Sequence, residues 1–550
     1  MKLKRLAALC MASVMAFSLT ACGNSEGGAG TNTGTAEDTR TNVSNGETKS
    51  QAEGGQVEDG QNKEPENSGQ DGGAGDEDLA DIEVMFWTQN TVPSDLETVE
   101  DAINAITEEK INTTVHLNII EMGSYTQQLN LMMSGSEKLD LMVTLPGDSA
   151  HFNSMTSQNQ LMDLTDLLTE YAPQLLETVP ESWIDGTSIN GRIYSVPSFG
   201  DKATPLCFIC RKDVLDETGI DPDSVKNADD LDALFAKVKE LHPDMTPVAI
   251  GSQKIIMTPY SLNSDGEFIK YEGLGEGDNS IISIIGNEGS EISNYYKTDE
   301  YKATIERMKD WYDKGYLYKD GSTYDEAAES LIFAGNYFGT FKMQAVGTEA
   351  SSSATCGHEM YFIQLDDSPV IDTVALRKFT WAVPVTATEP EAAVKFMNLL
   401  YTDAEVLNLV TWGVEGVHYQ TLEDGSIDFM DGQDANNCGY YLGDCTAIFG
   451  NGFLAKVRKG QDADLREKSK ELNLSAQVSR FNGFSFDTAG LENEVAGLTN
   501  TVEQYRPALA CGLYTEDYYQ EFLQKLKDNG VEKYLDTIQE QLDAWSKESN

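Results

Sequence analysis

Residues 23–80 contain no aromatic side chain, and this gap confines any folded domain to the remainder of the chain. The segment consists mainly of Gly, Ser, Thr, Asn, Gln, Glu and Asp, with 13 acidic and three basic residues. Such a composition buries too little apolar surface to offset the conformational entropy that folding removes. We therefore expect residues 22–80 to form a disordered acidic tether that expands through its own negative charge, and residues 81–550 to fold.

A short apolar stretch precedes this segment. The chain begins with MKLKR, and an apolar run follows from residue 6 to about residue 17. This order, with small residues at its end, is typical of a secretory signal peptide, which we expect over residues 1–21. The run is too short to span a membrane, because a spanning helix takes about 20 apolar residues.

The end of the apolar stretch, Leu19-Thr20-Ala21-Cys22, resembles the lipobox of bacterial lipoproteins. The resemblance implies that Cys22 receives a diacylglyceryl group, becomes the new N-terminus and is acylated, for example with palmitate. Two acyl chains together hold a protein stably on a membrane. We therefore expect a lipid anchor at the extracytoplasmic face of the cell membrane. The alternative is an ordinary signal peptide with an incidental cysteine.

The net charge argues against a nucleic-acid partner. Of the formal charge of −52, the tether carries −10 and residues 1–22 carry +3, which leaves −45 on residues 81–550. Nucleic-acid binding is dominated by cationic contacts to phosphate, and anionic lipid head groups repel an acidic domain. We expect no nucleic-acid partner, and solubility outside a cell accounts for the charge.

Six cysteines remain in the folded part: Cys207, Cys210, Cys356, Cys438, Cys445 and Cys511. The sequence CFIC has the spacing of a redox or zinc motif, but it lies in the strand-like run PLCFICRKDVL. Residues three apart on a strand point to opposite faces, so one metal ion could not bind both sulfurs. No second CxxC or HxxxH motif supports zinc. We expect structural thiols and no metal site, while a disulfide between Cys438 and Cys445 stays open.

The folded part alternates between strand and helix patterns. Strands are predicted at DIEVMFW, VHLNII and LDLMVTL, and Ser94–Glu97 matches a capping box at the start of a helix. NADDLDALFAKVKEL is amphipathic, and Tyr534, Ile538, Leu542 and Trp545 form a last helical stripe. This alternation predicts an α/β fold with helices on both faces of its sheets. Because 470 residues exceed one ordinary core, we expect two lobes.

Several long motifs resemble those of extracellular solute-binding proteins of carbohydrate importers. Three segments carry the resemblance: NGRIYSVPSFGDKATPLCFICRKDVLDETGIDPDSVKNADDLDALFAKVKE, LIFAGNYFGTFKMQA and AVPVTATEPEAAVKFMNLLYTD. The lipoprotein LipO-like branch of the family is resembled by WGVEGVHY, GFSFDTAGLENEVAGLTNTVEQYRPALACGL and GVEKYLDTIQEQLDAW. The resemblance covers roughly residues 80–550, although LCFIC departs from the aromatic-rich strand usual before Arg-Lys-Asp.

The resemblance implies a two-lobe, type II periplasmic-binding-protein-like fold with a hinge of crossing strands. On this expectation the first lobe holds residues 79–204 and 340–388. The second lobe then holds residues 205–339 and 389–550, including a family-specific C-terminal region. The lobes would close on a ligand in the cleft between them, where such sites usually lie.

Sugars are bound by aromatic faces and by planar polar groups. The end of the first predicted strand and its loop carry Trp87, Gln89 and Asn90, and the loop after LDLMVTL carries Asp148. Ligands bind at the carboxyl ends of strands in open α/β sheets, so we expect all four to contact the ligand. The alternatives are core packing for Trp87 and cap or turn roles for Asn90 and Asp148.

The family resemblance adds further candidate ligand contacts. They are Tyr260, in the loop after PVAIG, Lys342, in the crossover strand, and Trp381, at the second crossing. Trp412, in WGVEGVHY, is a candidate stacking platform. Core packing is the alternative for Trp381 and Trp412.

The sequence supports no catalytic residue and no cofactor. The five histidines lack metal-ligand spacing, and no Gly-x-Ser-x-Gly elbow is present. The glycine-rich GLGEGDNSIISIIGNEG lacks the Lys-Ser/Thr of a phosphate loop. DGSIDFMDGQD lacks the Glu that a calcium loop requires and is better interpreted as a hairpin with an Asp-Gly turn. With 91 carboxylates in the chain, a chance acidic pair for glycosidic cleavage stays open.

Together these patterns predict a monomeric, membrane-anchored substrate-binding protein that captures an oligosaccharide or similar solute. It would deliver the solute to the permease subunits of an ABC importer, with ATP hydrolysis on other chains. Ligand contacts with both lobes would favour the closed state. Three alternatives remain: a peptide or charged uronate as cargo, a surface-anchored glycan-degrading enzyme, and a receptor that reports the ligand to a sensor kinase.

Overall fold

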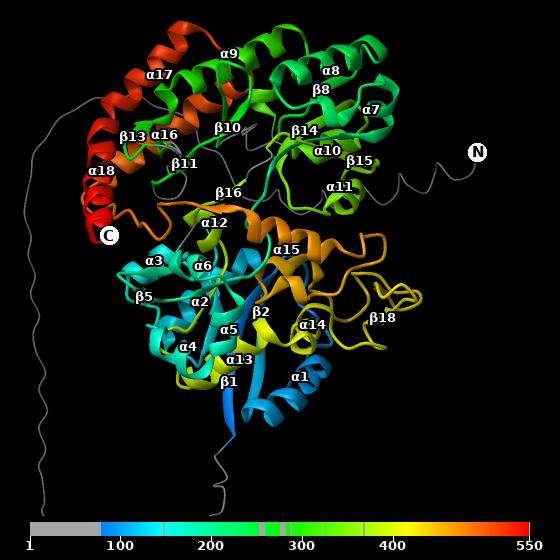
Figure 1. The fold of residues 1–550 in the computed structure, drawn as a ribbon, viewed down its shortest axis with the longest axis vertical. Helices are drawn as coiled ribbons and strands as arrows, with labels where there is room; N and C mark the ends of the chain where they lie inside the picture. The colour runs from blue at the N-terminus through cyan, green and yellow to red at the C-terminus, as the bar shows by residue number, and fades with distance from the viewer. Residues whose placement is uncertain are drawn as a thin grey trace, which may run out of the picture. The chain divides into compact units, whose positions relative to one another are not determined.

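The computed structural model describes residues 79–146, 149–251, 259–275, 282–285, 289–324, 326–366 and 369–548. The signal peptide expected over 1–21, the anchor expected at Cys22 and the tether up to residue 78 lie outside the described residues, as does Asp148. The described part is built around two main sheets, each with its own hydrophobic core (Figure 1).

The first sheet has the strand order β2-β1-β3-β17-β6. β1 is parallel to β2 and β3, whereas β17 runs antiparallel to β3 and β6. The carboxyl ends of β1, β3 and β6 and the amino end of β17 therefore meet along one edge. We call residues 87–90, 144–146, 198–200 and 378–380 the first-sheet edge. The strands are β1 (Ala80–Thr88), β2 (Thr113–Glu121), β3 (Leu141–Val143), β6 (Val196–Pro197) and β17 (Thr380–Ala382).

Helices pack against this sheet and bury the second half of β1 without interruption, as in sheets covered on both faces. α1 (Leu96–Ile111) packs on β2 and on α14 (Ala404–Trp412), and α13 (Pro390–Thr402) packs on β1, α4 (Thr165–Tyr171) and α5 (Pro173–Thr178).

The capping box expected at Ser94–Glu97 does not form. α1 begins at Leu96 with Asp95 as its N-cap, and no side chain caps the first turn. The Asp95 carboxylate instead accepts a hydrogen bond from Thr98 Oγ1 at 2.6 Å and lies 3.0 Å from His418 Nε2. A long-range contact therefore takes the place of the local one.

The second sheet has the strand order β15-β7-β14-β8. β14 is antiparallel to β7 and parallel to β8, and β15 is antiparallel to β7. The carboxyl ends of β8, β14 and β15 and the amino end of β7 therefore meet along a second edge. We call residues 205–206, 249–251, 342–344 and 364–366 the second-sheet edge. The strands are β7 (Leu206–Arg211), β8 (Thr246–Val248), β14 (Tyr337–Met343) and β15 (Met360–Gln364).

The CFIC strand is β7, and its cysteines lie on opposite faces, as predicted. Cys210 belongs to the main core of the second sheet, and Cys207 belongs to a smaller cluster with Cys356. All six cysteines of the described part are buried thiols, so Cys438 and Cys445 are not disulfide-bonded. Burial raises the pKa of the Cys207 thiol to about 12, which is typical of an unreactive structural thiol.

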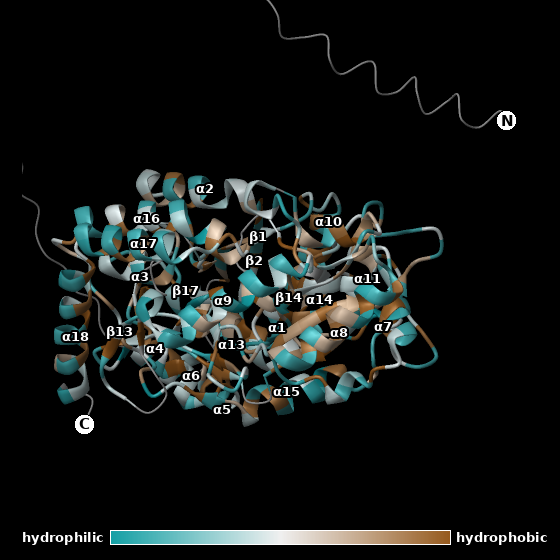
Figure 2. Ribbon diagram, turned by 90° about the horizontal axis from the view of Figure 1, so that it is seen from above, coloured by the Kyte–Doolittle hydropathy of each residue, from teal (hydrophilic) through white to brown (hydrophobic). Residues whose placement is uncertain are grey.

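Helices of the second sheet and of the C-terminal region pack together. α8 begins with a capping box made by Asn227 and Asp230, and α16 packs on α9 (Figure 1). The predicted last helix is confirmed by burial of Tyr534, Ile538 and Leu542, and α18 shows both hydrophilic and hydrophobic residues in Figure 2. These helices are α7 (Lys212–Thr218), α8 (Ala228–Leu241), α9 (Asp299–Asp313), α10 (Ala328–Phe333), α11 (Glu349–Cys356), α16 (Glu492–Ala510), α17 (Glu516–Asp528) and α18 (Val531–Glu548).

The smaller elements complete both halves, and the predicted Asp-Gly hairpin is confirmed as β18–β19. No helix in the described part of the chain has the length and hydropathy to cross a bilayer. The other elements are α2 (Met122–Gly135), α3 (Phe152–Ser157), α6 (Glu181–Asp185), α12 (Thr373–Arg377), α15 (Leu465–Ser475), β4 (Ser188–Ile189), β5 (Arg192–Ile193), β9 (Tyr260–Leu262), β10 (Phe268–Lys270), β11 (Glu272–Gly273), β12 (Ser283–Ile285), β13 (Ile292–Asn294), β18 (Tyr419–Thr421) and β19 (Ile427–Phe429).

The chain passes between the two cores three times. Residues 198–205 join β6 to β7. The other two passages contain β16 (Val370–Ile371) and β20 (Gln477–Val478), which pair in parallel. A hinge of crossing strands is thus present, but not where the sequence predicts it, because β14, which carries Lys342, and β17, which carries Trp381, belong to the two sheets.

The lobe boundaries expected from the sequence do not coincide with these cores. β14 pairs with β7 through Met343, so residues 340–343 belong to the second sheet and not to the first lobe. Phe396, Leu400 and Phe449 are buried in the core that contains β1, so this part of 389–550 packs with the first sheet and not with the second lobe. Long-range strand pairing and helix packing decide both cases.

Candidate functional site

The first-sheet edge holds two aromatic side chains and a pair of threonines. Trp87 is 2% exposed, and its ring centroid lies 5.4 Å from that of Phe379. Among the described residues the Trp87 Nε1–H has no hydrogen-bond partner. The hydroxyl oxygens of Thr144 and Thr380 lie 3.0 Å apart on neighbouring strands. Trp87 therefore lies at the edge where a ligand is expected, beneath the surface and in contact with the half-buried Phe379.

Two amide side chains follow Trp87. Gln89 is exposed and Asn90 is half-buried, and the Asn90 N–H donates to Thr88 Oγ1 at 3.1 Å. Each amide carries both a donor and an acceptor, as sugar hydroxyls require. Both residues lie just after the carboxyl end of β1, where the sequence places them.

Two of the expected ligand-contacting tryptophans are core residues. Trp381 is 0% exposed, it packs edge-on against Phe86, and its Nε1–H donates to Ile448 O at 2.8 Å. Trp412 is 5% exposed at the end of α14 and contacts Tyr441 within a small apolar cluster. Because stacking needs an open ring face, the structure favours the core-packing alternative for both tryptophans.

Tyr260 and Lys342 belong to the second half and have partners there. Tyr260 is 1% exposed, and its hydroxyl donates to the Asp366 carboxylate. Burial, together with the Asp366 charge, raises the pKa of Tyr260 well above its usual value. Lys342 is exposed at the end of β14, and its Nζ donates to Glu329 Oε1 at 2.6 Å. Although burial acts to raise the pKa of Glu329, the hydrogen bond from Lys342 holds it below its usual value.

The two edges lie at opposite ends of one short connection, because residues 198–205 run from the carboxyl end of β6 to the amino end of β7. α15 holds this connection. The backbone N–H groups of Lys202 and Ala203 each donate to Asn473 Oδ1 at 2.7 Å. The Asn473 amide in turn donates to Asp201 Oδ1 at 3.1 Å.

Sequence reasoning missed the lysines of the first-sheet edge and its neighbouring connection. Lys202 is 7% exposed, and its Nζ donates to Ser198 Oγ at 3.0 Å. Burial lowers the pKa of Lys202 to about 7, and the charge of Lys378 acts in the same direction. Lys378 is exposed, with its Nζ 5.5 Å from the centroid of the Phe379 ring. The available signal was position, since Lys378 and Phe379 directly precede the expected crossing at Trp381.

A polar cluster lies beside the crossing strands. Lys270 Nζ donates to Val370 O at 2.9 Å and lies 3.2 Å from Asp372 Oδ2. Glu272 accepts a hydrogen bond from Ser479 Oγ. Burial, followed by the charge of Asp372, raises the pKa of Glu272 to about 7. The cluster connects β10 and β11 of the second half to β16 and β20.

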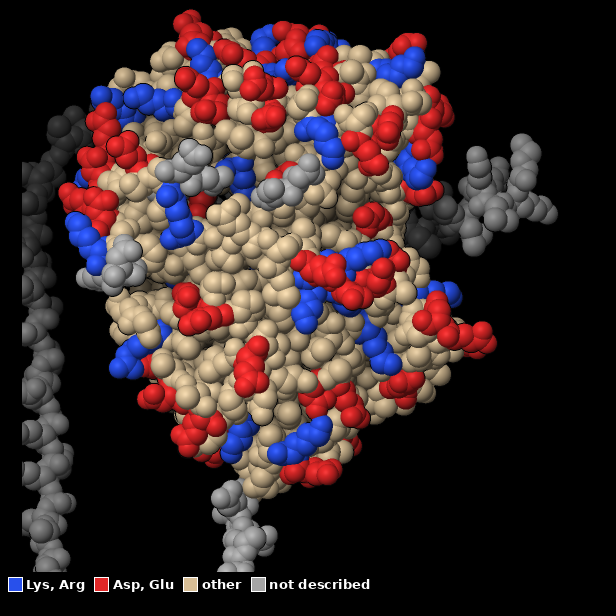
Figure 3. Space-filling model, in the orientation of Figure 1, with Lys and Arg blue, Asp and Glu red and all other residues tan. Residues whose placement is uncertain are grey.

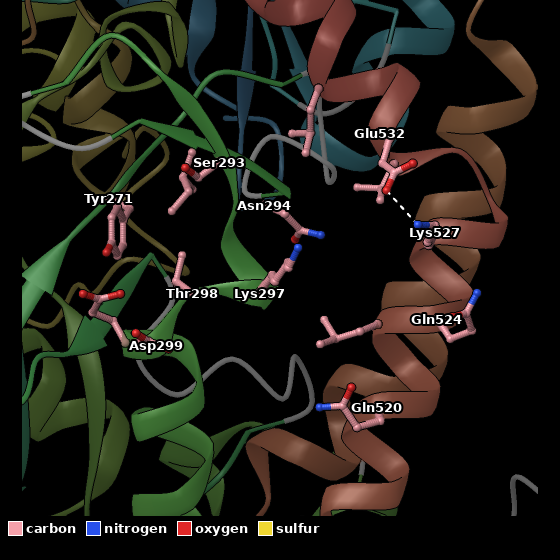
Figure 4. Close-up of a pocket in the computed structure, with 15 residues that line it drawn as sticks. Tyr271, Ser293, Asn294, Lys297, Thr298, Asp299, Gln520, Gln524, Lys527 and Glu532 are labelled. Atoms are coloured by element: carbon pink, nitrogen blue, oxygen red, sulfur yellow. Dashed lines mark ion pairs between the residues drawn. The ribbon is translucent and has the colours of Figure 1, made fainter.

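A cavity of about 830 Å³ lies between the start of α9 and helices α17 and α18 (Figure 4). Its walls combine polar side chains such as Asn294 with apolar ones such as Leu523, and Lys527 forms an ion pair with Glu532 at 3.1 Å. None of the described candidate site residues lines this cavity. Within the described residues, no group of three or more His, Cys, Asp or Glu side chains is arranged to hold a metal ion.

Comparison with known proteins agrees with this architecture. The family model described as bacterial extracellular solute-binding protein matches residues 92–406, and a domain of unknown function, DUF3502, matches residues 480–547. A carbohydrate ABC transporter substrate-binding protein of Streptococcus pneumoniae is 24% identical over 469 residues, which are 83% of this chain and 89% of the relative. Lipoprotein LipO of Bacillus subtilis is 25% identical over 245 residues, which are 43% of this chain and 44% of the relative.

Solved structures with the same fold include the N-glycan transport solute-binding protein NgtS of Streptococcus pneumoniae. Its TM-score is 0.71 at 22% identity, with 86% of this chain and all of that chain (100%) covered. An HMO-binding, ABC-transporter-associated solute-binding protein from Bifidobacterium longum infantis has a TM-score of 0.59 at 15% identity, with 85% and 99% covered. The fold is thus the two-lobe, type II periplasmic-binding-protein-like fold. With the family model matching more than half of the sequence, this chain belongs to the bacterial extracellular solute-binding protein family.

Proposed function

We propose that the protein captures an oligosaccharide between its two lobes and delivers it to the permease subunits of an ABC importer. The observation that carries this proposal is the similarity over 83% of the chain to a carbohydrate ABC transporter substrate-binding protein. Carbohydrate-binding proteins among the structures of the same fold add support. The family consists of binding proteins, and the proposed role includes no catalysis.

The proposed ligand contacts come from the two sheet edges. On the first edge, Gln89 and Asn90 offer donors and acceptors beside the half-buried ring of Phe379, which contacts the buried Trp87. On the second lobe, Lys342 and the Tyr260–Asp366 pair supply charged and polar groups. Aromatic faces and a few placed polar groups are what a saccharide site requires. Asp148, which follows β3 in the sequence, remains a proposed ligand contact.

The proposed lobes follow the two cores. The first lobe combines residues 79–204 with 370–478, and the second combines 205–366 with 480–548. A ligand that contacts both edges binds the closed arrangement more tightly and shifts the population toward it. The closed, monomeric protein then presents its surface to the permease. The proposed location is the extracytoplasmic face of the membrane, with the diacylglyceryl group on Cys22 as the anchor.

A thermal-shift screen of the mature protein against a glycan library tests the function. A ligand at a hundred times its Kd stabilises the native state by about 2.7 kcal/mol. For a folded part of about 470 residues this raises the Tm by roughly 3 °C. Glycans that raise the Tm and stay intact support the proposal. Cleaved glycans identify an enzyme, and a shift caused only by peptides identifies a different cargo.

A further inference from the structure

Two lysines at and next to the first-sheet edge form no ion pair with a carboxylate of the described residues, although the charge of Asp201 acts on Lys202. The chain has 91 acidic and 39 basic residues, so acidic partners are abundant. Even so, neither Lys202 nor Lys378 forms an ion pair with any described residue; the hydrogen bond of Lys202 Nζ goes to the neutral Ser198 Oγ. The neighbouring Asp201 carboxylate accepts hydrogen bonds from Ser469 and Asn473 instead.

The two ammonium groups lie close enough to affect one another. Burial lowers the pKa of Lys202, the charge of Lys378 adds to this shift, and the charge of Asp201 opposes it less strongly. A like charge and a desolvated position both disfavour the charged form of a lysine. Lys470 Nζ, 5.9 Å from the centroid of the Phe199 ring, places a further cation next to the same connection. A bound anion would relieve this concentration of positive charge.

The same place offers an aromatic surface and an unused donor. Phe379 is half-buried, with Lys378 Nζ 5.5 Å from one side of its ring and Trp87 in contact. The Trp87 Nε1–H is buried and has no partner among the described residues. A saccharide ring against Phe379 would therefore bring an acidic substituent within reach of cationic groups.

The carboxylates of the second half disfavour an anion there, because a carboxylate that accepts a hydrogen bond from a neutral tyrosine keeps its charge. Asp366 accepts the hydrogen bond of Tyr260, and Glu329 is paired with Lys342. The anionic end of a ligand thus has its favourable position on the first lobe. On the face shown in Figure 3, Asp and Glu gather over the end that holds α8, α9 and α17, and the middle of the face is mainly uncharged.

We propose that the transported solute carries a carboxylate, as in a uronate- or sialate-containing saccharide, and that Lys378 and Lys202 bind this carboxylate beside the Phe379 ring. The inference rests on the proposed function and narrows its cargo. Charge-assisted hydrogen bonds from lysine to a carboxylate are roughly twice as strong as neutral ones, so an acidic saccharide binds more tightly than its neutral counterpart.

Pairs of glycans that differ in the acidic group test the proposal by titration calorimetry on the mature protein. Suitable pairs are trigalacturonate with galactotriose and 3′-sialyllactose with lactose, and a sulfated lactose serves as a second anion. We expect an acidic member to bind at least about tenfold more tightly than its neutral partner and to weaken as NaCl is added.

Several results would overturn the proposal. If the neutral members bind equally or more tightly, or if only neutral glycans from the wider library bind, an acidic cargo is excluded. The proposed function as an oligosaccharide-binding protein is then unaffected. Binding of the sulfated lactose as tightly as the carboxylates removes carboxylate selectivity. Failure of every glycan overturns the proposed function as well.

Substitutions then locate the anion. Lys378→Gln should weaken the acidic glycan at least about tenfold and leave the neutral one unchanged. Lys395→Gln is the matched control, because Lys395 Nζ also lies over an aromatic ring, 5.1 Å from the Tyr171 centroid, but on α13. Lys202→Met tests the buried lysine in the same way, after an unchanged Tm has shown that the variant folds. If Lys378→Gln and a folded Lys202→Met both keep full affinity for the acidic glycan, the assigned position is wrong.

Discussion

Replacing Asn473 by alanine tests whether α15 holds the connection between the two lobes. Asn473 is 1% exposed, and its Oδ1 accepts hydrogen bonds from the buried N–H groups of Lys202 and Ala203, each at 2.7 Å. Alanine removes both bonds and leaves two buried donors without an acceptor. Since each such donor costs about 1–3 kcal/mol, the free energy of unfolding should fall by about 2–6 kcal/mol.

Scanning calorimetry of the mature protein measures this loss. An unfolding entropy of about 2.1 cal/mol/K per residue, over a folded part of about 470 residues, converts 1 kcal/mol into roughly 1 °C of Tm. Asn473→Ala should therefore lower the Tm by about 2–6 °C. In the control Asn437→Ala, the lost bond is an exposed one from the Asp434 N–H at 2.7 Å, and the change should stay within about 0.5 kcal/mol. A fall below about 1 °C for Asn473→Ala, or an equal fall in the control, refutes the reasoning.

Three further predictions concern the core, the crossing strands and the anchor. Trp381→Phe should destabilise the protein by about 1–3 kcal/mol, because the hydrogen bond to Ile448 O is lost, and should leave glycan affinity unchanged. A variant of unchanged stability that no longer binds glycans would show instead that Trp381 contacts the ligand. Burial and Asp372 raise the pKa of Glu272 from 4.5 to about 7, so the stability due to this group is complete below pH 4.5 and is lost as the pH rises through 7. Glu272→Gln should flatten that fall in Tm, and an unchanged pH profile contradicts the assignment. Cys22→Ser should move the protein from the membrane fraction to the soluble fraction; continued sedimentation with membranes would exclude the lipid anchor.

The sequence predicted the local elements of the fold well. Alternating or continuous apolar runs marked β1, β2, β3 and β7, and CFIC placed its two cysteines on opposite faces, because strand geometry follows from a period of two. It predicted the lobe boundaries poorly. The pairing of β14 with β7 and the packing of α13 beside β1 join segments that are distant in the chain, and no local pattern reports such contacts.

The candidate site was predicted only in part, for a related reason. The sequence does not distinguish an aromatic residue that lines a binding site from one that is buried in a core. Trp381 is buried in a core. Lys202 and Lys378 gave only a weak signal, the position of Lys378 before Trp381, because a lone lysine is ordinary in a sequence. Their significance depends on the three-dimensional structure, in which neither lysine forms an ion pair with a described residue.

The three passages between the cores also bear on how the chain acquires its structure. β3 can pair with β17, its second neighbour in the sheet, only after a long segment has been synthesised, because Thr144 and Thr380 are 236 positions apart. The helices that complete the core of the second half extend to Leu542, near the C-terminus. A fold assembled from such distant pieces forms slowly, and no single cut in the backbone yields two halves that each contain a complete core. Neither core can be completed until most of the chain has been synthesised, which would suit the proposed extracytoplasmic location.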